Sequence, residues 1–107
     1  MNAFETLFET IKERKNQKTE GSYTCYLFES GLDKILKKCG EESAEMIIAA
    51  KNKDNDELKN EIGDLFYHIF VLMQENGVEF SEIEAVLDAR ARKTGNLKTF
   101  HNTDKNT

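Results

Sequence analysis

Residues 32–51, LDKILKKCGEESAEMIIAAK, form the stretch that decides the fold of this chain. Its apolar side chains recur every three or four positions, at Leu32, Ile35, Leu36, Cys39, Met46 and Ala49. This spacing places them on one face of an α-helix, and the stretch has no proline to interrupt that helix. Yet Glu41, Glu42 and Glu45 lie inside it, and a packing face seldom holds so much negative charge.

A second long helix is predicted over residues 54–76, after a polar break. Asp54 and Glu57 match the spacing of a capping box, and Gly77 suits the left-handed position that ends a helix. Apolar residues point nearly all round this helix, at Leu65, Phe66, Ile69, Phe70, Leu72 and Met73. A helix that is apolar on most sides needs packing partners on most sides. We therefore expect an antiparallel hairpin of the two long helices, completed by oligomerisation.

Shorter helices are expected over residues 3–15, 22–30 and 81–91. Asn2 and Ser22 are suitable N-caps for the first two. Ser81 and Glu84 match a second capping box, which predicts that Ser81 caps the third. The pattern predicts an all-α bundle of about four to five helices.

Length and charge limit the possible functions. The chain has 107 residues and a net charge of −5. This length predicts one domain, residues 1–92, and a polar tail, residues 93–107, that lacks a helical pattern and is expected to be mobile in isolation. Nucleic acid is not expected as a partner because phosphate binding requires a basic face. No apolar run has membrane-spanning length, and Cys25 and Cys39 lack metal or redox spacing, so we expect a cytoplasmic protein with reduced thiols.

The positions of the glutamates on the two helices need an explanation. Lysines four residues before Glu41 and Glu42 allow a solvated face with ion pairs as one explanation for these two. Glu61 falls within the apolar stripe of the second helix, and no lysine or arginine lies at the neighbouring helical positions. An unpaired carboxylate among leucines is costly or takes up a proton. Glu61 therefore predicts a cation that the chain does not supply locally.

Antiparallel packing would bring the acidic edges of the two helices together near their middles. The predicted ligands of a divalent metal ion are Glu42, Glu45, Glu61 and Asp64. Glu41 is either a further ligand or the base that orients a water molecule. Oxygen ligands without thiols or imidazoles favour Mg²⁺, with Mn²⁺ as the alternative. A di-iron site would need a histidine three residues after a glutamate, which this chain lacks.

The acidic pattern resembles the signature of a known superfamily. Glu41-Glu42-x-x-Glu45 followed by Glu61-x-x-Asp64 is similar to the motifs of the all-α nucleotide pyrophosphohydrolases, which include MazG-type enzymes and dimeric dUTPases. Residues 21–52 resemble more closely the phosphoribosyl-ATP pyrophosphohydrolase family. That family's motifs appear here in order, as Ser22-Tyr23-Thr24, Gly31 and Lys37-Lys38-Cys39-Gly40-Glu41-Glu42. The resemblance extends over residues 4–92.

This resemblance implies Mg²⁺-dependent hydrolysis of 1-(5-phosphoribosyl)-ATP to phosphoribosyl-AMP and pyrophosphate, the second step of histidine biosynthesis. It also implies a homodimer. Lys34 and Lys38 lie on the same helix edge as the glutamates and are candidate phosphate contacts, although solvated lysines fit equally well. Ser22, Tyr23 and Thr24 are candidates for the substrate pocket, although capping alone explains Ser22.

Two other functions fit the sequence. One is a house-cleaning (d)NTP pyrophosphatase of the MazG type, with the same metal chemistry and a different base pocket. The other is a non-catalytic helical interaction module whose acidic face binds ions or a basic partner. Whichever function holds, including the one that the resemblance implies, His68 is expected to be a structural histidine rather than a ligand.

Overall fold

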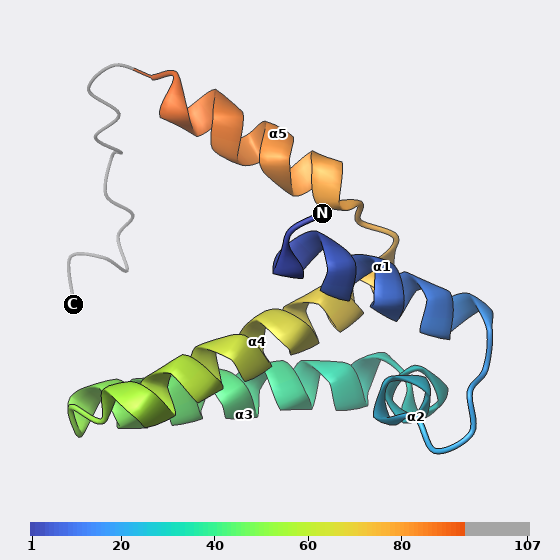
Figure 1. Ribbon diagram of the computed structural model, residues 1–107, viewed down its shortest axis with the longest axis horizontal. Coiled ribbons are helices and arrows are strands. Elements are labelled where there is room, and N and C mark those ends of the chain that lie inside the picture. Colours follow the sequence, from blue (N-terminus) through green and yellow to red (C-terminus); the bar gives the residue numbers. More distant parts are fainter. Residues whose placement is uncertain (94–107) are drawn as a thin grey trace.

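The computed structural model describes residues 1–93, and the regular secondary structure in that range is entirely helical. Its elements are α1 (Ala3–Asn16), α2 (Tyr23–Ser30), α3 (Leu32–Lys51), α4 (Asn55–Asn76) and α5 (Phe80–Ala91). Helices α3 and α4 run antiparallel along each other, α1 packs on α4, and α2 lies at the N-terminal end of α3 (Figure 1). The predicted all-α hairpin fold is confirmed. The tail predicted over residues 93–107 lies outside the described range, apart from Lys93.

The first, second and fourth helices begin at the predicted caps. Side-chain oxygens of three residues accept the backbone N–H three positions on, at 2.9 to 3.2 Å: Asn2, Ser22 and Asp54. Each bond satisfies an N–H group that has no partner within the first helical turn. Helix α4 ends as predicted, since Gly77 adopts a left-handed conformation with φ of 73°.

Helix α5 begins earlier than predicted. The spacing of Ser81 and Glu84 predicts a cap at Ser81, and this prediction is wrong, because the N-cap is Glu79. The backbone N–H of Glu79 donates to the Glu82 side chain at 2.6 Å. Phe80, the first helical residue, packs against the hydrophobic core. Burial of this aromatic ring stabilises a helix that begins at Phe80. The spacing of Ser81 and Glu84 carries no information about that burial.

The core lies where α1, α2, α3 and α4 meet. Its buried members are Phe8, Ile11, Leu27, Ile35, Phe70, Val71 and Met73. Apolar side chains elsewhere remain exposed, and Ile47 on α3 and Leu87 on α5 are 62% and 57% exposed. Helix α5 extends away from the other helices over most of its length (Figure 1). None of the described helices is long and apolar enough to cross a membrane.

Candidate active site

The hairpin brings three carboxylates together: Glu42 and Glu45 from α3 and Glu61 from α4. Glu42 and Glu45 share one face of α3 because residues three apart are neighbours on a helix surface. One oxygen from each of the three side chains lies within 4.8 Å of the others. Opposite ligands of an octahedral Mg²⁺ are about 4 Å apart, so a small adjustment lets the three oxygens bind one ion.

Two of these glutamates are buried with oxygens left unpaired. Glu42 is 7% exposed and Glu61 is 8% exposed. The Oε2 atom of each is buried and has no hydrogen-bond partner among the residues that the structure describes. Within residues 1–93, Glu61 takes part in no ion pair. Buried acceptors without partners are rare in folded proteins, and a cation bound between these carboxylates would satisfy both oxygens. The donor set and its unpaired atoms therefore fit a divalent cation.

Mutual repulsion changes the protonation of this cluster. The pKa of Glu61 rises from 4.5 to about 8, first through its hydrogen bond with Glu57 and then through Glu45, burial and Glu42. Neighbouring carboxylates titrate as a coupled group because each charge disfavours the next. Without a cation, the cluster therefore retains a proton at neutral pH.

Glu57 is a member of this environment that the sequence pattern did not assign to the site. It lies one turn before Glu61, and it lines an open cleft of about 390 Å³ together with Glu45 and Glu61. In the sequence, Glu57 is explained by its capping-box spacing from Asp54, so no role in a site is assigned to it. The i,i+4 spacing between Glu57 and Glu61 was the available signal, since such residues share a helix face.

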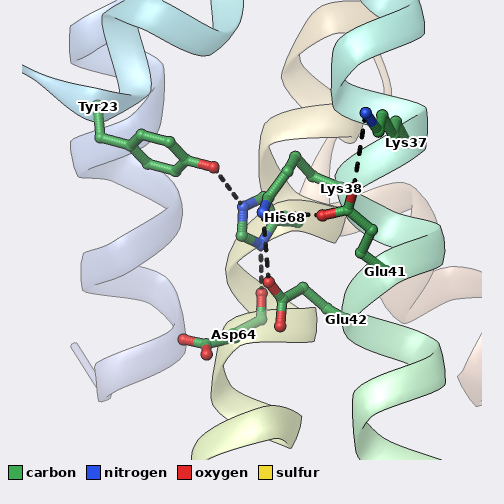
Figure 2. Close-up of polar contacts among 7 residues, drawn as sticks. All are labelled: Tyr23, Lys37, Lys38, Glu41, Glu42, Asp64 and His68. Carbon is green, nitrogen blue, oxygen red and sulfur yellow. Dashed lines mark hydrogen bonds and ion pairs between the residues drawn. The ribbon is translucent and has the colours of Figure 1, made fainter.

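Two predicted site residues lie outside the group of three. Asp64 is exposed, and its carboxylate points away from Glu42 (Figure 2). Glu41 pairs with Lys38 at 3.1 Å and with Lys37 at 3.9 Å. The hydrogen bond from Lys38 holds the pKa of Glu41 below its usual range. Catalytic or ligand roles for Asp64 and Glu41 stay predictions.

The predicted phosphate-binding lysines lie along the same edge of α3. Nζ of Lys38 is 3.1 Å from Glu41 and 3.8 Å from Glu42 (Figure 2). The hydrogen bond with Glu41 raises the pKa of Lys38, so this side chain remains charged. Nζ of Lys34 lies 5.9 Å from the centre of the Tyr26 ring. Both lysines stay predicted phosphate contacts.

The Ser-Tyr-Thr motif connects α2 to α4. Ser22 caps α2, as its position predicts. The Tyr23 hydroxyl lies 3.1 Å from Nε2 of His68, and the Thr24 hydroxyl forms a hydrogen bond with the hydroxyl of Tyr67. His68 is buried and hydrogen-bonded, which agrees with its expected structural character. Tyr23 and Thr24 stay candidates for substrate binding.

Comparison with known proteins identifies the family. The family described as phosphoribosyl-ATP pyrophosphohydrolase matches residues 4–91, a range that includes both acidic motifs. Phosphoribosyl-ATP pyrophosphatase of Clostridium botulinum is 54% identical over 102 residues, which are 95% of this chain and 93% of that relative. Proteins of the same name from Listeria welshimeri and Streptococcus gordonii are 57% and 53% identical over 93 residues, or 87% of this chain and 86% and 89% of theirs. The chain therefore belongs to the phosphoribosyl-ATP pyrophosphohydrolase family, as its sequence resemblance predicted.

Proposed function

We propose that the chain hydrolyses 1-(5-phosphoribosyl)-ATP to phosphoribosyl-AMP and pyrophosphate, using Mg²⁺ held by Glu42, Glu45 and Glu61. Membership of the family supports the reaction and its place in histidine biosynthesis. The observation that carries the metal site is the pair of buried, unpaired oxygens on Glu42 and Glu61. Every donor is a carboxylate oxygen, which Mg²⁺ prefers and Mn²⁺ also accepts. Asp64 would complete the ligand set if its side chain rotated toward Glu61.

The proposed chemistry assigns different tasks to the side chains around the cluster. A bound divalent cation neutralises phosphate charge and lowers the pKa of a coordinated water molecule. Glu42, Glu45 and Glu61 fix its position because two packed helices carry them. Glu61 would hold the cation in its ionised form, so the proton that it carries without a cation would be released to solvent. Lys38, which remains charged, would stabilise the negative charge on the departing pyrophosphate.

In this proposal, Glu41 orients the attacking water molecule. Its lowered pKa keeps it ionised, and an ionised carboxylate accepts hydrogen bonds without donating any. It lies on the edge of α3 that also carries Lys38 and Glu42. Alignment of the water with the phosphorus atom is a main requirement of phosphoryl transfer.

The decisive experiment is Glu61→Gln, which keeps the size of the side chain and removes its charge. Pyrophosphate release from phosphoribosyl-ATP is expected to fall by orders of magnitude, because a positioning ligand is lost. The melting temperature of the metal-free protein should not fall at neutral pH, since Glu61 already holds a proton there and glutamine is uncharged as well.

Glu75→Gln is the matched control, because Glu75 is on the same helix and pairs only with Lys15 in the described ion pairs, at 3.2 Å. It should retain activity. Normal activity of Glu61→Gln combined with a lower melting temperature would show that Glu61 is structural. Comparable turnover of common nucleoside triphosphates by the wild-type chain would favour the house-cleaning alternative instead.

We also infer that the chain acts as a homodimer or higher oligomer. The large apolar side chains exposed on α5 are Ile83, Val86 and Leu87, and α3 exposes Ile47 and Ile48. A chain of this size builds a modest core, so burial of these side chains against a second copy would add stability. Ile48 also lines the cleft that leads to the carboxylates, and a second copy seated there would border the site.

A further inference from the structure

The two hydrogen-bond partners of His68 show which of its ring nitrogens carries a proton and which accepts a hydrogen bond. His68 is 5% exposed, its Nδ1 lies 2.7 Å from the backbone oxygen of Asp64, and its Nε2 lies 3.1 Å from the hydroxyl of Tyr23 (Figure 2). A carbonyl oxygen can only accept a hydrogen bond, so Nδ1 carries a proton. In the uncharged ring Nε2 then has no proton and accepts a hydrogen bond from the hydroxyl of Tyr23.

Tyr23 consequently has no proton left for another partner. A phenol carries one O–H, and His68 takes it, but the oxygen can still accept a hydrogen bond. A phosphoryl oxygen is also an acceptor and gains nothing from such a hydroxyl. A sugar hydroxyl can donate, so the tyrosine oxygen is suited to bind a sugar rather than a phosphate.

The Tyr23 ring is held firmly and remains accessible. It stacks on Tyr26 and on Tyr67, with centroids 6.1 Å apart in each pair, and the His68 ring meets it at an angle of 81°. Tyr23 is still 45% exposed, and with Tyr26 it lines an open cleft of about 470 Å³.

The hydroxyl of Tyr23 is directed at His68, and in the view of Figure 2 Lys38 and Glu42 of α3 lie on the other side of that ring. Burial raises the pKa of Tyr23, and of the charges that act on it Lys38, which lowers it, and Glu42, which raises it, have the largest effects. Glu42 belongs to the group of three carboxylates. Tyr23 therefore lines the open cleft, and its hydroxyl is directed toward the side chains that surround the proposed metal site.

We propose that Tyr23, oriented by His68, is a specificity-determining residue that accepts a hydrogen bond from the ribose attached to the substrate's α-phosphate. This inference rests on the proposed function, and it adds that Tyr23 recognises the ribose of the substrate. The adenosine ribose is chosen because it adjoins the phosphate at the cleaved bond, and the Tyr23 hydroxyl is directed toward the side of the hairpin that carries Lys38 and Glu42. His68 is a positioning residue that acts through Tyr23.

Binding of AMP, 2′-deoxy-AMP and 3′-deoxy-AMP in the presence of Mg²⁺ tests the proposal by calorimetry. The wild-type chain should bind AMP about tenfold more tightly than one of the two deoxy forms, as expected for one lost hydrogen bond. In Tyr23→Phe this preference should disappear, with the affinity for that deoxy form unchanged. In His68→Leu the preference should shrink, because the tyrosine hydroxyl is no longer oriented.

Tyr67→Phe is the matched control. It removes a tyrosine hydroxyl that pairs with Thr24 in the same contact between α2 and α4. This variant should keep the preference for AMP. If Tyr23→Phe weakened all three nucleotides equally, its oxygen would serve Lys38 or the fold, and the proposal would be wrong. Absence of any preference in the wild-type chain would overturn it as well. Melting temperatures identify a variant that does not fold, and Tyr23→Phe, which loses one atom, decides the matter if His68→Leu is unstable.

Pyrophosphate release from phosphoribosyl-ATP is measured separately on the wild-type chain. Its absence would refute the proposed function, whereas normal release without discrimination between the nucleotides would refute the role of Tyr23 alone.

Discussion

Glu61 is the residue in which packing and function conflict most directly. Its side chain is buried beside Glu42 and Glu45, and the structure gives its Oε2 no hydrogen-bond partner. A purely structural position of this kind would be better filled by an apolar residue. The placement makes sense if binding of a cation to the folded state compensates for the repulsion.

The raised pKa of Glu61 predicts an unusual pH dependence for the metal-free protein. Its hydrogen bond with Glu57, followed by Glu45, burial and Glu42, moves the pKa from 4.5 to about 8. Between these values the folded state holds a proton that the unfolded state has released, so this contribution to stability is lost as pH rises from about 4.5 to about 8. Melting temperatures in a chelator across this range should fall more steeply for the wild-type chain than for Glu61→Gln.

Addition of Mg²⁺ at about pH 8 should raise the melting temperature of the wild-type chain, because the cation binds the folded state. The increase should be smaller in Glu61→Gln. Parallel pH profiles for the two proteins, with no response to Mg²⁺, would contradict the assignment of the cluster as a metal site.

At the scale of the element, α4 depends on its N-terminal cap, Asp54, which lies two turns before Glu61. The Glu57 N–H donates to Oδ1 of Asp54 at 3.1 Å. Asp54→Ala should lower the free energy of unfolding by about 1 kcal/mol, since this first-turn N–H loses its acceptor. Chemical denaturation measures the loss. Asp56→Ala removes a negative charge from the same first turn without removing the cap, so it should cost less, and equal losses would mean that charge alone matters.

At the scale of the whole molecule, none of the other helices described in residues 1–93 runs along most of α5 (Figure 1). If a second copy covers this helix, Leu87→Lys should weaken association, because a charge would enter an apolar interface. Light scattering at micromolar concentration should then show a smaller mean mass than that of the wild-type chain. Ala85→Lys places the same charge on the opposite side of α5 and should leave the mass unchanged. A folded monomer for the wild-type chain itself would exclude the proposed oligomer.

The helices and the main acidic residues could be predicted from the sequence because their signals are local. Apolar spacing located the hairpin, and Asn2, Ser22, Asp54 and Gly77 marked helix ends by interactions that span only a few residues. The position of Glu61 within an apolar stripe indicated an unpaired buried carboxylate, and its burial agrees. The family followed from motifs that the sequence displays directly.

Distances between side chains on different helices were decided by the tertiary structure alone. Spacing along a helix gives the direction of a side chain only to within part of a turn, whereas coordination and hydrogen bonding depend on shifts of about 1 Å. Packing of α3 against α4 therefore brought Glu61 to Glu42 and Glu45 and left Asp64 outside this group. Tyr23 and His68 are 45 residues apart, and only the docking of α2 against α4 creates the hydrogen bond between them.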